Sequence, residues 1–100
     1  MAAHHHTRSI NLQEVTLTLD EWPGSQGRPV LFLHATGFSR GVWRPIARDL
    51  RGECRPFALD LRGHGDSRTS LDVGNWTPMV NDVEQLVVRE DWSGLVIVGH

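Results

Sequence analysis

The chain has 100 residues, with ten Arg and no Lys against twelve acidic residues, which gives a formal net charge of -2. Because domains usually span about 50 to 250 residues, this length allows one domain at most. The acidic balance argues against a nucleic-acid partner, since such proteins carry a basic patch. Apolar runs of about five residues at most exclude a membrane span, which needs roughly 18.

The N-terminal segment, residues 1–7, is expected to form a disordered tail. His4, His5 and His6 invite a metal-binding interpretation, but a tag remnant or solvated tail is favoured, because chain ends are rarely tied down. The segment lacks the apolar core of a secretory signal. Cys54 is the only cysteine, which excludes an internal disulfide and makes the cytoplasm the default compartment.

Two kinds of strand are predicted. Residues 8–21 read as strand, and the apolar–polar alternation of residues 15–19 favours a half-buried antiparallel strand near a sheet edge. Continuous apolar runs at residues 30–33, 57–59 and 95–98 are typical of parallel strands that are covered on both faces.

Helices are predicted between these runs. Apolar positions share one face of residues 42–51, with Pro45 in the first turn and Gly52 just after the end. A second helix is expected to begin at Thr77 as N-cap, with Pro78 as its first residue. The resulting strand–helix alternation predicts an α/β fold with right-handed crossovers.

Unusual residues follow the buried strands. His34, Asp60 and His100 each close one of them, and ligands of open parallel sheets bind beyond the carboxyl ends of the strands. A phosphate-binding loop is not supported, because Gly63-His64-Gly65 lacks a third Gly at the required position and the chain has no Lys. A metal site of His34, His64 and His100 is disfavoured, since no carboxylate or Cys stands at ligand spacing. We therefore expect no cofactor and no metal.

Four motifs occur in a characteristic order. They are the apolar strand into His34-Ala35-Thr36-Gly37-Phe38, Trp43 opening a helix, Asp60-Leu61-Arg62-Gly63-His64-Gly65-Asp66-Ser67, and Val96-Ile97-Val98-Gly99-His100. Together they resemble the N-terminal part of the α/β-hydrolase family over residues 14–100. The resemblance implies antiparallel leading strands, then parallel strands with crossover helices, and an incomplete single domain over residues 8–100.

The resemblance implies a role for the loop after the first buried strand. In the family this loop forms half of the oxyanion hole, so the backbone amide of Thr36 is the expected donor to a developing oxyanion. Ala35 stands where Gly is usual, so either the turn keeps a negative φ or Phe38 supplies the donor instead. His34 is expected to be a hydrogen-bonded turn histidine rather than a catalytic group. The candidates for substrate contact are His34, Gly37, Trp43 and His100, with Phe38 as a pocket wall.

The segment over residues 60–67 is expected to be structural. Two Gly residues allow a sharp reversal, and polar side chains can bond the turn, so a catalytic role for Asp66 or Ser67 is the less favoured interpretation.

Gly99-His100 resembles the opening of G-x-S-x-G, in which the nucleophile follows at once. The nucleophile and the later acid and base then lie outside residues 1–100. We therefore expect this chain to be the front piece of a longer polypeptide and to be inactive alone.

Three hypotheses remain for the parent protein. The first is a serine hydrolase acting on an ester, thioester or amide of a small apolar acyl compound. The second is an Asp-nucleophile epoxide hydrolase or dehalogenase, which Gly37 disfavours because those relatives commonly carry Pro there. The third is a non-catalytic binding module. The expected partners are a small molecule and the remainder of the domain, with neither nucleic acid nor membrane.

Overall fold

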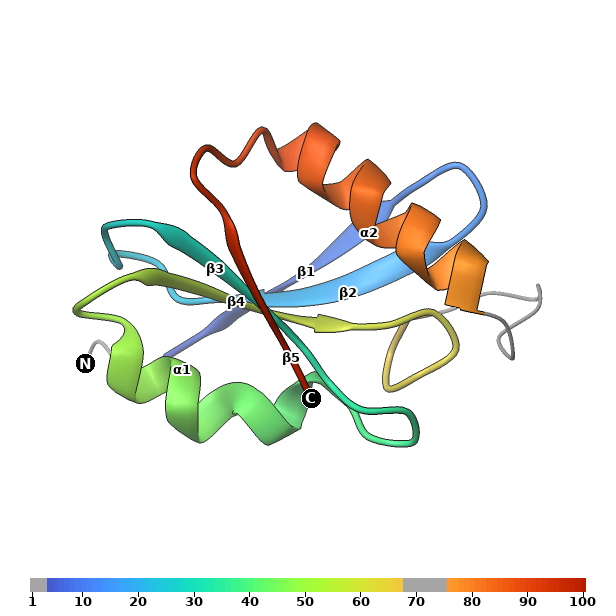
Figure 1. Cartoon of the computed structure of the whole chain (residues 1–100). Helices are drawn as coiled ribbons and strands as arrows, with labels where there is room; N and C mark the ends of the chain where they lie inside the picture. The colour runs from blue at the N-terminus through green and yellow to red at the C-terminus, as the bar shows by residue number, and fades with distance from the viewer. Residues whose placement is uncertain (1–3, 68–75) are drawn as a thin grey trace.

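The computed structural model describes residues 4–67 and 76–100, which form one mixed sheet with helices on both faces (Figure 1). Its strand order is β1-β2-β4-β3-β5. The strands are β1 His6–Asn11, β2 Thr16–Glu21, β3 Pro29–Leu33, β4 Arg55–Asp60 and β5 Val96–Gly99. The helices are the 3-10 helix η1 Arg40–Trp43 and the α-helices α1 Arg44–Leu50 and α2 Trp76–Glu90.

The leading part of the chain is a hairpin rather than one strand. β1 pairs antiparallel with β2, and the Leu12 amide donates to the Val15 carbonyl at 2.8 Å in the turn between them. The expected disordered tail over residues 1–7 is wrong for His6 and Thr7, which belong to β1. Thr7 is also held by a hydrogen bond from its hydroxyl to the Asp20 carboxylate, at 2.8 Å.

β2 is more buried than its alternating pattern predicts. It pairs antiparallel with both β1 and β4 and lies one strand in from the β1 edge of the sheet, so the expected antiparallel position near an edge is confirmed. Leu17, Thr18, Leu19 and Asp20 are all buried, and the expectation of a half-buried strand is therefore wrong. The polar members of this set alternate with the leucines and face the opposite side of the sheet.

The three continuous apolar runs form the parallel strands, as predicted, but the expected coverage on both faces is wrong for β5, where Val96 and Ile97 are exposed. β3 pairs parallel with β4 on one side and with β5 on the other. Leu33 is in register with Leu59 of β4 and with Gly99 of β5. The carboxyl ends of the three strands therefore lie in one row.

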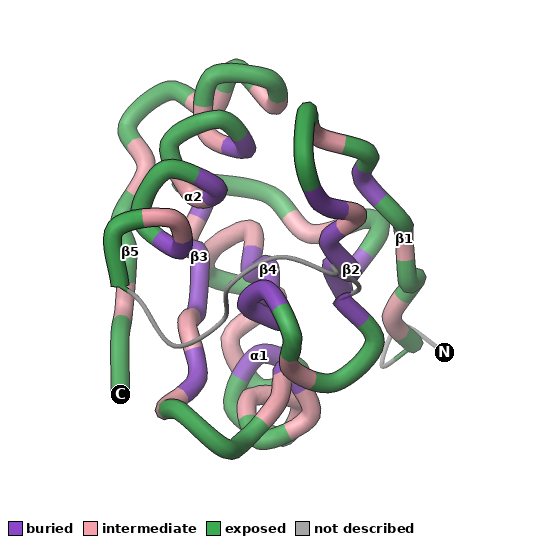
Figure 2. The backbone as a smooth tube through the Cα atoms, turned by 90° about the vertical axis from the view of Figure 1, so that its right-hand side faces the viewer, coloured by how far each residue is buried: buried purple, intermediate pink, exposed green. Residues whose placement is uncertain are grey.

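Each face of the sheet has its own core. On one face, Leu86 of α2 packs into a cluster of buried leucines that includes Leu17, Leu31 and Leu59. On the other face, Ala47 of α1 packs against Trp22 and Ala58. Figure 2 shows the buried positions gathered along the central strands, between the two helices.

The helix boundaries differ slightly from the prediction. The expected helix over residues 42–51 is divided into η1 and α1, with Trp43 as the N-cap of α1. α2 begins at Trp76, so Thr77 lies inside the helix rather than at its N-cap. Gly52 follows α1 without the positive φ of a glycine cap. Neither α1 nor α2 has the length and apolar character that crossing a bilayer requires.

Candidate active site

The candidate site lies at the carboxyl ends of β3, β4 and β5. His34 and His100 directly follow β3 and β5, and Asp60 is the last residue of β4. The His100 amide donates to the Leu33 carbonyl at 3.1 Å, which extends the β3–β5 pairing to the last residue. The loop after β3 and the end of β5 are therefore neighbours at one edge of the sheet, as the sequence motifs predict.

The loop after β3 opens with a tight turn over residues 35–38. The Phe38 amide donates to the Ala35 carbonyl at 3.0 Å, and Gly37 has φ +89° while Ala35 and Thr36 keep a negative φ. This is the geometry of a type II turn, in which Gly is favoured at the third position. Ala35 is therefore accommodated without the positive φ that would strain it.

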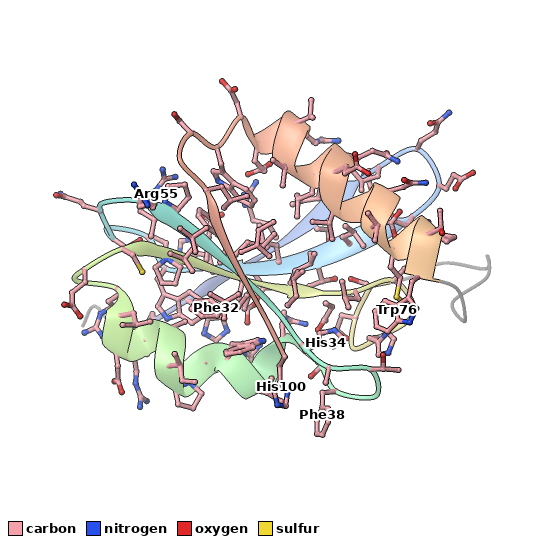
Figure 3. All side chains as sticks on the ribbon, in the orientation of Figure 1. Phe32, His34, Phe38, Arg55, Trp76 and His100 are labelled. Atoms are coloured by element: carbon pink, nitrogen blue, oxygen red, sulfur yellow. The ribbon has the colours of Figure 1, made fainter. Side chains whose placement is uncertain are left out.

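The turn treats the two candidate amide donors differently. The Phe38 amide already donates to the Ala35 carbonyl. The Phe38 ring is 55% exposed and points away from the sheet in Figure 3. No acceptor for the Thr36 amide occurs among residues 4–67 and 76–100. Within the described part of the chain, Thr36 thus presents an unbonded backbone donor at the carboxyl edge of β3.

His34 is buried and orders this loop. Its Nδ1–H donates to the Ala35 carbonyl at 2.8 Å, and its Nε2 accepts the Leu61 amide at 3.0 Å. The interpretation as a hydrogen-bonded turn histidine is confirmed by these two contacts. Burial of the ring lowers the pKa of His34 from its ordinary value of 6.5, with the neighbouring His64 acting in the same direction.

The lowered pKa of His34 predicts a pH-dependent stability. Because the unfolded chain binds the proton more readily than the folded chain, unfolding free energy falls as pH drops below 6.5. We expect His34→Gln, whose amide can still donate and accept hydrogen bonds, to reduce this slope of unfolding free energy against pH. Urea unfolding between about pH 7.5 and about pH 5 measures it. Equal slopes for the two proteins would contradict this assignment.

A buried charge cluster of Asp20, Arg40 and Asp60 lies beneath the loop, on the α1 face of the sheet. The Arg40 guanidinium donates from Nε to Asp20 at 2.8 Å and from Nη1 to Asp60. Burial opposes the charged form of both groups, but their hydrogen bonds outweigh it, raising the pKa of Arg40 and lowering the pKa of Asp20. Arg44 donates to the other Asp20 oxygen at 2.8 Å from a more exposed position.

The carboxylate of Asp60 joins the two loops that follow β3 and β4. It accepts the Arg40 amide at 2.6 Å and the Asp66 amide at 2.8 Å. Ser67 is buried, and its hydroxyl donates to the Asp60 carbonyl while accepting the Thr18 amide at 2.8 Å. These contacts support the structural interpretation of residues 60–67 and leave Ser67 without access for catalysis.

The same segment is tied to α2 by a buried ion pair. The Arg62 guanidinium makes two parallel hydrogen bonds to the Asp82 carboxylate, each at 2.7 Å. Both side chains are about as buried as the leucines of the core. This pair and the buried charge cluster were missed at the level of sequence. The sequence did offer one signal for them: a charged residue at a position that faces the interior must have a partner of opposite charge.

An apolar cavity of about 600 Å³ opens beside the candidate site, between α2 and the ends of β3 and β5. Figure 3 shows three of its lining residues, His34, Trp76 and His100. Trp43 is not among the lining residues; its ring packs on Phe32 at 4.8 Å and lies edge-on to His100 at 6.4 Å, measured between ring centres. The other lining residues are Leu33, Leu61, Met79, Val80, Val83, Glu84, Val87, Val88, Ile97 and Gly99.

His34 and His64 lie side by side near the strand ends. The rings of His34 and His64 lie 5.0 Å apart between centres, but both nitrogens of His34 are engaged with backbone groups. Over residues 4–67 and 76–100, no three His, Cys, Asp or Glu side chains are grouped to hold a metal ion.

A family model and several solved structures are similar to this chain. Residues 30–100 match the family model described as "Alpha/beta hydrolase family". Similar solved structures include Cfl2 from Burkholderia cenocepacia, at 24% identity and TM-score 0.87 over 96% of this chain and 33% of that one. The haloalkane dehalogenase DatA from Agrobacterium tumefaciens C58 has 26% identity and TM-score 0.85 over 100% of this chain and 35% of that one. A candidate lipase from Acinetobacter baumannii AYE has 23% identity and TM-score 0.87, over 98% and 33%.

The chain spans about a third of the length of these solved structures. The search of curated proteins gave no significant match.

Proposed function

Since the chain belongs to the alpha/beta hydrolase family, we propose that it supplies the N-terminal portion of one hydrolase domain whose nucleophile directly follows His100. One observation carries the proposal: the Thr36 amide, which has no acceptor among the described residues, follows the end of β3, and the His100 amide is bonded to the last residue of that same strand. A group mounted after His100 would therefore project at the edge of the sheet that bears Thr36.

The proposed chemistry is acyl transfer by a serine nucleophile. Attack on the carbonyl carbon places negative charge on the carbonyl oxygen, and a preplaced amide stabilises that charge in the transition state. Thr36 N–H is the proposed donor from this chain, while the serine, its histidine base and the supporting acid come from later residues. The type II turn keeps the Thr36 amide fixed before the reaction, which avoids reorganisation as the charge develops.

The proposed substrate is a small apolar acyl compound. The cavity beside the candidate site is lined almost wholly by aliphatic and aromatic side chains, and Glu84 is the one carboxylate among its described lining residues. Apolar pockets with few polar groups favour apolar ligands by burying their surface.

An Asp-nucleophile hydrolase is the second candidate. The similarity to a haloalkane dehalogenase at 26% identity favours it, whereas Gly37 in place of Pro favours the serine enzyme. The residue after His100 separates the two, and Gly or Ala there would indicate a non-catalytic binding module. Covalent labelling of the full-length protein by a fluorophosphonate is expected only in the serine case.

Replacing Thr36 with Pro tests the proposed donor. Pro removes the amide hydrogen but suits the second position of a type II turn, so the backbone is preserved. We expect kcat of the full-length enzyme to fall about 100- to 1,000-fold with little change in KM. Thr36→Ala is the matched control, since it keeps the amide and should retain activity. Unchanged kcat in Thr36→Pro would exclude Thr36 as the donor.

A further inference from the structure

Arg40 occupies an unusual position for a residue just after the candidate oxyanion loop. It begins η1, only two residues beyond Phe38, yet it is 7% exposed. Its guanidinium reaches three carboxylates that come from different parts of the fold: Asp20, Asp60 and Asp66. A buried arginine with this many partners fixes its own backbone as well as its side chain.

The backbone of Arg40 is held by the same carboxylate that its side chain neutralises. The Arg40 amide donates to Asp60 Oδ1 at 2.6 Å, while Nη1 donates to Asp60 Oδ2. The loop after β3 is therefore anchored at both ends, by His34 at its start and by Arg40 at its far end. The Thr36–Gly37 turn lies between these two anchors.

The charge balance makes Arg40 necessary for this anchor. Asp20 and Asp60 are both fully buried, and a buried carboxylate without a cationic partner is strongly disfavoured. Asp20 keeps Arg44 when Arg40 is removed, but Asp60 keeps only backbone amides among its described partners. Loss of Arg40 thus acts chiefly on Asp60, the group that holds the loop.

We propose that Arg40 is a positioning residue for the oxyanion hole. By bridging Asp20 and Asp60, its guanidinium fixes the position of the Thr36 amide relative to the end of β3. This inference rests on the proposed function of that amide. Arg40 touches no reacting atom, and it acts only through the Asp60 carboxylate and the loop backbone.

The test compares Arg40→Met with Arg44→Met in the full-length protein. Both variants remove a cation from Asp20, but only the first removes one from Asp60. We expect Arg40→Met to lower kcat per folded molecule by about tenfold or more with KM within about threefold, since small misplacements of a catalytic group are costly. Arg44→Met should keep kcat within about twofold. Equal kcat values for the two variants would overturn the proposal.

A second readout does not depend on catalysis. The Phe38 amide reports on the turn, because it is bonded to Ala35. In Arg40→Met we expect its hydrogen exchange to accelerate about tenfold or more relative to Arg44→Met. If the wild-type protein shows no hydrolase activity, the proposed function fails while this exchange still decides the role of Arg40. Equal exchange rates would overturn that role.

Should Arg40→Met fail to fold, Arg40→Lys and Arg44→Lys replace the pair. Lys keeps the charge but cannot bridge two carboxylates with one planar fork. The same difference in kcat and in Phe38 exchange is expected between them, and its absence would refute the positioning role.

Discussion

Asp82→Leu is expected to lower the unfolding free energy by about 3 to 5 kcal/mol, because breaking a buried ion pair by removing one partner is strongly destabilising. Asp82 receives two 2.7 Å hydrogen bonds from Arg62, and both side chains are nearly inaccessible to solvent. The loss should appear as a lower urea midpoint with an unchanged slope.

Two further variants make this result specific. The double variant Arg62→Met/Asp82→Leu should recover most of the loss, since a well-packed apolar pair often replaces a buried ion pair without cost. Asp49→Leu removes the exposed partner of Arg48, at 3.8 Å, and is expected to change stability by less than about 1 kcal/mol. A double variant as unstable as Asp82→Leu would show that the pair is not the source of the effect.

Gly65→Ala is expected to destabilise the protein by about 2 to 4 kcal/mol, from backbone strain and overpacking together. Gly65 has φ +51°, and a Cβ there would overlap the buried Asp60 carboxylate. The methyl group would have to displace the group that holds the Arg40 and Asp66 amides. Thermal unfolding and urea unfolding both measure this loss.

Gly52→Ala is the matched control for Gly65→Ala. Gly52 has no positive φ, and a Cβ there would meet nothing within 4 Å. The substitution should be neutral or stabilise by about 0.4 to 1 kcal/mol, because Ala restricts the unfolded chain. Comparable losses at the two positions would contradict the account of the Asp60 contact.

The parallel part of the sheet was predictable because its strands carry their signal locally. Residues 30–33 and 95–98 are continuous apolar runs, and such runs are typical of parallel strands, which is the pairing that β3 and β5 adopt. Their carboxyl ends align, so His34 and His100 were correctly expected at one edge. A negative φ at Ala35 was one of the two alternatives left open, and it is the one observed, because Gly37 supplies the positive φ of the turn.

The polar contacts could not be predicted, because they depend on the order of the strands. Asp20 and Asp60 meet at Arg40 only because β2 pairs with β4, a relation that the local pattern does not specify. For the same reason, β2 is buried on both faces, although its alternation of apolar and polar residues is typical of a strand with one exposed face. The first strand was missed at His6 and Thr7 because polar residues form an edge strand through backbone pairing, which leaves little trace in composition.

The most direct test of the central claim is a crystal structure of the full-length protein after reaction with a fluorophosphonate. We expect an adduct on the residue after His100, with a phosphoryl oxygen about 2.7 to 3.1 Å from the Thr36 amide nitrogen. An adduct whose phosphoryl oxygens all point away from Thr36, or one formed on a different residue, would contradict it.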